Sequence, residues 1–224
     1  AANVGGIMDA KGRTPFERAV ATAYTSKLGL GSSAFHQGNA PEGPAETVFL
    51  GVFRKADLVA AGGFSPEFDR AQDWELNYRL RQSGREVWFS PNLRVTYRPR
   101  STVKALARQF FRTGQWRREV MRRHRDSVSL RYLAAPIAVT GITVGTVFGL
   151  VGAVQAAKGK TLKRWPLVGW AAPLGYASII GVGSAVMKRD LDPGVRARLP
   201  LVLAIMHMSW GAGFLVGLGD RAND

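Results

Sequence analysis

One carboxylate in this sequence stands where it could act as a general base. Asp73 follows a loop and opens the segment Asp-Trp-Glu-Leu-Asn-Tyr-Arg-Leu-Arg-Gln, whose residues favour a helix. The amino-terminal end of a helix keeps a carboxylate ionised. An ionised carboxylate that projects into a cleft can take the proton of an attacking hydroxyl group. The alternative is an ordinary helix-capping aspartate, and spacing alone favours that role.

The other residue types that often do chemistry form no site of their own. The chain has no cysteine, which excludes disulfides and thiolate metal sites. Its histidines, His36, His124 and His207, lack the spacing of a metal-ligand set. We expect His207, inside an apolar segment, to hydrogen-bond between helices. Asp190 and Asp192 lie in a loop between apolar segments, so we interpret them as solvated, and we predict no metal ligands in this chain.

The positive charge is the strongest feature of the composition. The 224 residues carry 31 Lys and Arg against 16 Asp and Glu, a net charge of +15. Such a balance attracts nucleic acid, anionic lipid head groups or a nucleotide diphosphate. Ten of these cations lie within residues 100–131, directly before apolar segments that carry almost none. This placement indicates a membrane, whereas a nucleic-acid partner would rest on charge alone and is not expected.

Strand and helix patterns alternate through the first part of the chain and predict an α/β layer. The expected elements are a helix over residues 14–28, a long loop over 29–44, a buried strand over 47–53, a short helix over 55–61, the Asp73 helix over 73–82, and short strands at 86–89 and 93–97. The Asp73 helix should end at Ser83-Gly84, because a left-handed glycine is a common helix exit.

Residues 101–125 predict a single amphipathic helix with an apolar stripe and a cationic face. Such a helix suits the head-group boundary of an anionic leaflet. The alternative is a soluble helix that packs on its own domain.

Three apolar segments close the chain, at residues 132–157, 166–187 and 199–219. None contains Asp, Glu, Lys or Arg, and each exceeds the roughly 20 residues needed to cross the hydrocarbon, so we predict about three transmembrane helices. The glycines at 141, 145 and 149 should form a face for close helix contact. The basic block before the first span should stay cytoplasmic. Three spans would then put the basic loop after the first span outside, a conflict that a re-entrant or interfacial segment would remove.

Several strings, in order along the chain, resemble membrane-anchored family-two glycosyltransferases of the succinoglycan-biosynthesis type. The string Arg-Ala-Gln-Asp-Trp-Glu-Leu-Asn-Tyr-Arg-Leu-Arg at residues 70–81 is similar to their acceptor-site motif, in which Glu-Asp or Gln-Asp precedes a helix ending in Arg-Leu-Arg. Residues 47–55 and the Gly-Gly-Phe at 62–64 resemble their strand-turn segment. Residues 97–101, 108–118 and 207–214 continue the likeness, which covers nearly the whole chain.

The resemblance implies an α/β fold, the C-terminal part of a GT-A, Rossmann-like domain over residues 1–98, followed by a basic interfacial helix over 99–131 and a transmembrane region over 132–224. It implies an inverting transfer, of the hexosyltransferase type, from a nucleotide-diphosphate sugar to a glycan or lipid-linked acceptor. The transfer would take place at the cytoplasmic face of the cell membrane, with Asp73 as the base.

The same resemblance suggests substrate-binding residues on the basic helix. Gln109, Trp116 and Arg117 form a loose version of the family's Gln-x-x-Arg-Trp element, with wider spacing and with Gln115 where arginine usually precedes the tryptophan. Arg112 or Arg117 could stabilise the charge that develops on the diphosphate. The alternative is a basic interfacial helix with no role in the site.

The family's N-terminal half, with nucleotide-binding strands and an Asp-x-Asp pair that holds a divalent metal, has no counterpart in residues 1–98. We therefore expect Mg or Mn to bind in the complete enzyme through ligands outside this chain. These would lie upstream of residue 1 or on a separate polypeptide. The alternative function is a non-catalytic membrane remnant or an accessory subunit of polysaccharide assembly.

Overall fold

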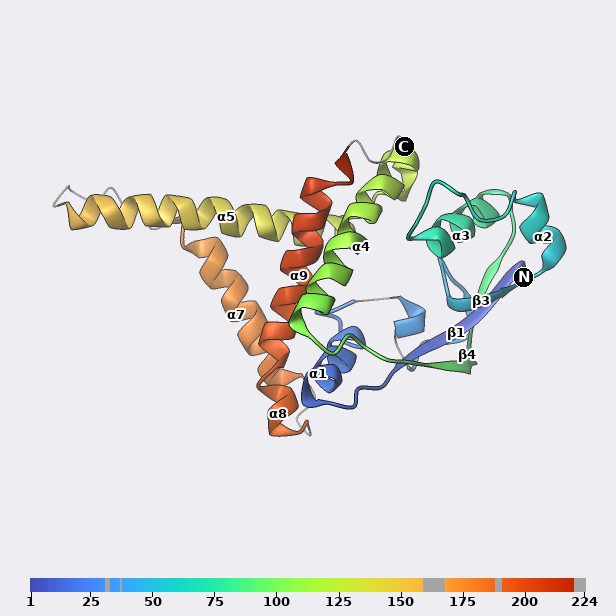
Figure 1. Cartoon of the computed structure of the whole chain (residues 1–224), viewed down its shortest axis with the longest axis horizontal. Helices are drawn as coiled ribbons and strands as arrows, with labels where there is room; N and C mark the ends of the chain where they lie inside the picture. The colour runs from blue at the N-terminus through green and yellow to red at the C-terminus, as the bar shows by residue number, and fades with distance from the viewer. Residues whose placement is uncertain (31–32, 37, 159–167, 188–190, 220–224) are drawn as a thin grey trace.

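A computed structural model describes residues 1–30, 33–36, 38–158, 168–187 and 191–219. A small sheet with two short helices lies at one end of the molecule, and long helices form the other end (Figure 1). Helix α5 projects far beyond the rest of the chain (Figure 1).

The sheet has the strand order β2-β4-β1-β3. Its strands are β1 (Asn3–Ala10), β2 (Gly43–Pro44), β3 (Phe49–Phe53) and β4 (Val87–Tyr97). Strand β1 pairs in parallel with β4 and antiparallel with β3, and β2 pairs antiparallel with β4.

Strand β4 corrects the expectation of two short strands. Its pairing with β1 continues across Pro91, with Gly5 opposite Phe89 and Ile7 opposite Arg94. A bulge of this kind takes up the proline, which cannot donate to the ladder, and lets one strand run on.

The sheet differs from the prediction in two further ways. Strand β1 was not predicted, because the paired glycines Gly5 and Gly6 weaken a strand pattern. Strand β3 was expected to be buried, yet Leu50 and Val52 are 60% and 73% exposed. The reason is that β3 is an edge strand, whose side chains alternate between the two faces of the sheet.

The helices within residues 15–127 begin and end largely where local signals place them. They are α1 (Pro15–Tyr24), η1 (Ala34–His36), α2 (Lys55–Ala60), α3 (Gln72–Gln82), α4 (Val103–Arg123) and η2 (Arg125–Ser127). Helix α1 ends four residues earlier than expected, because the hydroxyls of Thr25 and Ser26 bond back to carbonyls of its last turn. Helix α3 ends as predicted: Gly84 adopts φ +76° and donates to the Arg81 carbonyl.

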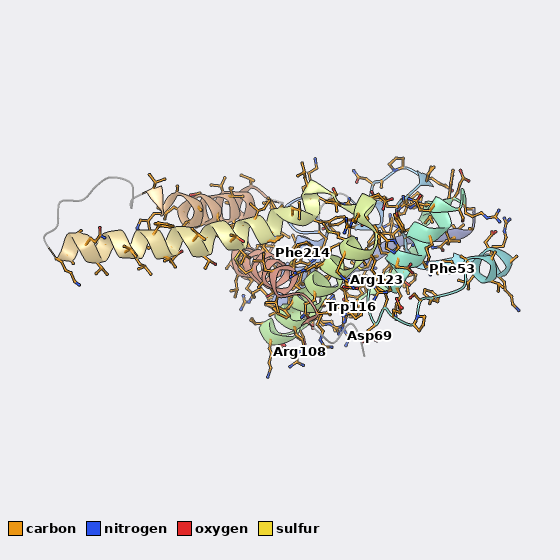
Figure 2. All side chains as sticks on the ribbon, turned by 90° about the horizontal axis from the view of Figure 1, so that it is seen from above. Phe53, Asp69, Arg108, Trp116, Arg123 and Phe214 are labelled. Carbon is orange, nitrogen blue, oxygen red and sulfur yellow. The ribbon has the colours of Figure 1, made fainter. Side chains whose placement is uncertain are left out.

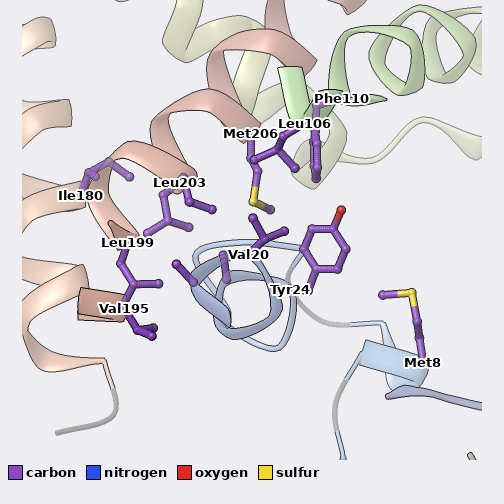
Figure 3. Packing of buried hydrophobic residues seen from close by; sticks show 13 residues of the cluster. Met8, Val20, Tyr24, Leu106, Phe110, Ile180, Val195, Leu199, Leu203 and Met206 are labelled. Atoms are coloured by element: carbon purple, nitrogen blue, oxygen red, sulfur yellow. The ribbon is translucent and has the colours of Figure 1, made fainter. Parts of the chain in front are cut away.

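The largest buried cluster joins the sheet-side part of the chain to the apolar C-terminal helices. Figure 3 shows Val20 and Tyr24 of α1 packed with Leu106 and Phe110 of α4 and with Met206 of α9 (Leu199–Val216). Helices α1, α4 and α9 therefore share one core.

Helices α4 and α9 lie in close contact along their length (Figure 1). A Cβ atom at Gly114 of α4 would collide with the carbonyl oxygen of Trp210, and one at Gly213 of α9 would collide with that of Phe111. The apolar stripe of α4 thus packs largely on protein, as the soluble-helix alternative proposed, while its cations at 104, 108 and 112 remain exposed.

Within the described residues, two helical segments are long and apolar enough to cross a membrane. They are α5 (Leu130–Ala157) and the segment Pro193–Val216, which combines α8 (Pro193–Arg196) with α9. Only 11% of the most apolar window of α5 is buried. A core helix of a soluble protein would be mostly buried, so this much exposed apolar surface favours a hydrocarbon environment.

The third expected span is not established. Helix α7 (Ala171–Val186) has 16 residues, fewer than the roughly 20 needed to cross a bilayer. The predicted segment 166–187 begins outside the described residues. The glycine face of α5 does make a close helix contact, because a Cβ at Gly145 would meet the carbonyl of Gly169 and the ring of Pro173, beside α7.

Candidate active site on helix α3

Asp73 lies in the first turn of α3, as predicted, but it does not cap the helix. The capping position belongs to Ala71, whose φ of +62° is left-handed and which contributes no side-chain hydrogen bond. This conformation costs a non-glycine residue roughly 1–3 kcal/mol, and such strain is found most often at functional sites. The capping alternative is therefore not what the structure has.

The Asp73 carboxylate has no partner among the residues that the structure describes. Its side chain is exposed, and the loss of part of its hydration raises the pKa of Asp73 above the ordinary aspartate value. A free, exposed carboxylate with a raised pKa can accept a proton and is better matched to base chemistry near neutral pH.

A buried chain of amides fixes α3 against the sheet. The Nδ2 group of Asn3 donates to Oδ1 of Asn77 at 2.7 Å, and Nδ2 of Asn77 donates to Oγ1 of Thr47 at 2.8 Å. Asn77 is fully buried, and a buried amide without partners is costly. These bonds hold α3 in one position relative to β1.

The guanidinium of Arg79 fixes the other side of α3 to the segment after α2. Arg79 donates two hydrogen bonds to the carboxylate of Glu75 within the same helix, from Nε to Oε1 at 2.6 Å and from Nη2 to Oε2 at 2.8 Å. The same guanidinium donates to the carbonyls of Ala61 and Gly63, after α2. The carboxylate of Glu75 also lies 3.5 Å from Nε2 of His124, which follows α4.

A stack of aromatic and cationic groups joins α3 to α4 and α5. The guanidinium of Arg117 lies 4.5 Å from the ring centroid of Trp74 and 4.1 Å from that of Tyr132. The rings of Trp74 and Tyr78 stack at 5.5 Å. Burial lowers the pKa of Arg117, which nevertheless stays charged because arginine is not deprotonated in proteins.

Trp116 contacts the loop that leads into α3. The centroid of its ring lies 5.8 Å from that of the Phe68 ring, and the guanidinium of Arg123 lies 5.0 Å from the centroid of the Phe68 ring. Both residues belong to α4 (Figure 2), and Arg123 also pairs with Glu67. Two of the four expected substrate-binding residues, Trp116 and Arg117, therefore meet the segment that carries Asp73.

The other two expected residues lie apart from α3. Gln109 donates to the hydroxyl of Tyr97 at 3.2 Å and accepts from Nε of Arg100 at 3.1 Å, beside the α1 core. Arg112 is exposed and forms no ion pair with any residue in the described ranges. The structure does not bring all four residues together.

No group of three or more His, Cys, Asp or Glu side chains that could hold a metal ion occurs among the described residues. Oδ1 of Asp192 accepts from the Gly194 amide at 2.8 Å and caps α8, and Asp190 lies outside the described residues. The side chains in the part of the chain that the structure describes therefore do not fit a divalent metal.

His207 makes the interhelical bond expected of it. Its Nδ1 lies 3.2 Å from the hydroxyl of Tyr176 on α7, and its Nε2 lies 2.6 Å from the Leu28 carbonyl. It therefore connects two apolar helices to the segment after α1.

Trp74 and Tyr132 were not predicted as site residues, although they hold Arg117. The local signals were present, since Trp74 directly follows Asp73 and Tyr132 lies in the first turn of an apolar helix. Nothing in the sequence pattern, however, says which arginine of a basic helix will enter between two distant rings.

Comparison with known proteins adds one relative. Over 208 residues the chain is 31% identical to the succinoglycan biosynthesis protein ExoA of Rhizobium meliloti (strain 1021). The match covers 92% of this chain, which spans 58% of the length of that protein. No protein-family model and no solved structure matches the chain. The match supports a relationship to the glycosyltransferases whose motifs the sequence resembles.

Proposed function

We propose that this chain is the acceptor-side part of an inverting, membrane-bound glycosyltransferase. It would move a sugar, of the hexose class, from a nucleotide diphosphate to a glycan or lipid-linked acceptor at the cytoplasmic face of the cell membrane. The observation that carries the proposal is the Asp73 carboxylate, which has no partner among the described residues and is held at the start of a helix that is fixed on both sides. Similarity to a polysaccharide-biosynthesis protein over 92% of the chain supports it.

The proposed reaction is a single displacement. The acceptor hydroxyl attacks the anomeric carbon, the bond from that carbon to the diphosphate oxygen breaks, and Asp73 takes the hydroxyl proton. The negative charge passes to the leaving nucleoside diphosphate. Arg112 or Arg117 is proposed to stabilise that charge, Arg112 from an exposed position on α4 and Arg117 from its contact with Trp74, which follows Asp73.

Anionic lipid is the proposed partner of the cationic face of α4. Lys104, Arg108 and Arg112 follow one another at four-residue spacing, so they share one side of the helix, and all three are exposed. Each such residue near an anionic leaflet contributes about 1 kcal/mol of attraction. A multi-pass protein with this face in the cytoplasm also agrees with the positive-inside rule.

Donor binding is proposed to need a further nucleotide-binding half with its Mg or Mn site, either upstream or on a separate polypeptide. The relative is longer than the matched region, which is compatible with such a half. The second candidate function, a non-catalytic accessory subunit, is favoured by the lack of a metal-ligand group among the described residues.

The test is sugar transfer by membranes that contain the chain in its full reading frame. Radiolabelled nucleotide-diphosphate hexoses are supplied singly, and label is counted in the lipid and glycan fractions. Asp73→Asn should lower transfer by about 10²- to 10⁴-fold, the usual contribution of a general base. Asp69→Asn, which changes an exposed aspartate in the preceding loop, should leave it unchanged.

Near-normal transfer by the Asp73→Asn membranes would remove Asp73 from the base role. Absence of transfer with every donor in the wild-type membranes would favour the accessory subunit instead.

A further inference from the structure

A cavity of about 180 Å³ lies between α3 and the connection from α4 to α5. Its walls include the rings of Trp74, Tyr78 and Tyr132 together with Arg81 and Ser129. Asp73 is not among the lining residues, so this space is distinct from the proposed base.

Three buried N–H donors around this cavity have no partner in the described part of the chain. They are Nε1 of Trp74, Nε of Arg81 and Nη1 of Arg117. Trp74 is 8% exposed and, like Arg81, lines the cavity, while the Arg117 guanidinium lies against the rings of Trp74 and Tyr132. A buried donor left unpaired costs about 1–3 kcal/mol, so the two that belong to lining residues, Trp74 and Arg81, indicate a ligand with acceptor oxygens.

The amino-terminal end of α5 reaches the same cavity. Helix α5 has 28 residues, and its capping residue, Ser129, makes no side-chain hydrogen bond to the first turn. The start of a long helix carries a partial positive charge and uncapped amide groups, which favour an anion.

The acidic groups of the cavity wall are already engaged. Asp126 accepts hydrogen bonds from the hydroxyl of Tyr78 and from Nε2 of Gln82, the latter at 3.3 Å. Glu46 pairs with Arg131 at 2.5 Å. Among the described residues, no carboxylate pairs with Arg81 or Arg117, so the positive charge around the cavity exceeds the negative charge.

The position of the cavity identifies the source of the anion. Val128 and Ser129 in its wall directly precede α5, and Tyr132 lies in the first turn of that helix. Helix α5 is long and apolar enough to span a bilayer. In a spanning orientation its first turn would lie at the level of the lipid head groups.

We propose that this cavity binds the phosphate group of a membrane lipid. The phosphate would belong either to a phospholipid head group or to a lipid-linked sugar acceptor, and only the second source rests on the proposed function. Arg81 and Trp74 donate to its oxygens, with the start of α5 beside them, and the Arg117 guanidinium against the rings of Trp74 and Tyr132 adds positive charge.

The test is lipid binding by the purified full chain in a non-ionic detergent, measured by native mass spectrometry. The probes are short-chain phosphatidic acid, a short polyprenyl phosphate and inorganic phosphate. Both lipids should bind at one saturable site. Arg81→Gln should weaken that binding about tenfold or more, since a hydrogen bond to a charged group is lost. Trp74→Phe keeps the ring but removes the donor, so it should weaken binding about fivefold without unfolding the site.

The matched control is Arg13→Gln, which removes an exposed cation of the loop before α1 and leaves both the cavity and the cationic face of α4 intact. It should change the affinity less than twofold. A loss as large as that of Arg81→Gln would mean diffuse surface attraction and would overturn the proposal, as would the absence of saturable lipid binding.

The choice of probe separates the sources. Tighter binding of polyprenyl phosphate would assign the site to a lipid-linked acceptor, and tighter binding of phosphatidic acid would assign it to a phospholipid. Inorganic phosphate bound as tightly as either lipid would overturn the lipid assignment. No sugar donor is present, so the result is independent of whether Asp73 acts as a base.

Discussion

The Asn77 amide offers the most direct test of how α3 is held. In Asn77→Ala, the bonds to Asn3 and Thr47 are lost, and each such bond contributes about 1 kcal/mol. The amide of Asn3, which is 1% exposed, is also left without its partner, at a further cost of about 1–3 kcal/mol. We therefore expect the free energy of local opening of α3 to fall by about 2–4 kcal/mol in all. This is somewhat less than the sum of the separate costs, because neighbouring groups relax into part of the space that the side chain leaves.

Hydrogen–deuterium exchange measures this quantity at the helix itself. At 1.36 kcal/mol per factor of ten, exchange of the α3 amides should accelerate about 30- to 900-fold in the variant. Asn92→Ala is the control, because Asn92 is an exposed asparagine in β4. If α3 exchanges within twofold of the wild-type rate in Asn77→Ala, the amide chain does not hold the helix and the reasoning fails.

The remaining predictions concern Asp73 and the contact between α4 and α9. The acidic limb of the pH profile of transfer should lie above the ordinary aspartate pKa of 3.8, because the pKa of Asp73 is raised and only its ionised form is a base; a limb at or below 3.8 would contradict this. For the same reason the folded state disfavours the Asp73 charge at neutral pH, so Asp73→Asn should melt at an equal or higher temperature than the wild type at pH 7, a difference that disappears as the pH falls below the unfolded pKa; a clearly lower melting temperature would count against it. Gly114→Leu should destabilise the packing of α4 on α9 by about 1–3 kcal/mol or more, seen as a lower melting temperature in detergent, whereas Gly175→Leu, which faces open space on α7, should not; equal effects would show that Gly114 is not a contact point.

Local signals predicted the elements that carry Asp73. The glycine exit at Gly84 and the acidic first turn of α3 are short-range features, and α3 begins and ends within one residue of the expected positions. Strand β1 escaped notice because Gly5 and Gly6 interrupt its apolar pattern, and its place in the sheet depends on partners more than 40 residues away.

The site itself was predictable only in part. A resemblance in sequence selected Asp73, but the sandwich of Arg117 between Trp74 and Tyr132 forms across three helices, and pattern alone does not specify it. The sequence also did not specify what covers the apolar stripe of α4, because residues such as Leu106 and Phe110 suit contact with lipid and contact with protein equally well.

The core shared by α1, α4 and α9 has a consequence for the reach of the molecule. Because the apolar helix α9 packs into one core with α1 and with residues of β1, the sheet is not joined to α9 by a free tether. If α9 spans a membrane as proposed, the carboxylate at the start of α3 would stay at a constant height above the membrane plane. Acceptors attached to a lipid would be held near that height, whereas freely diffusing sugars would not.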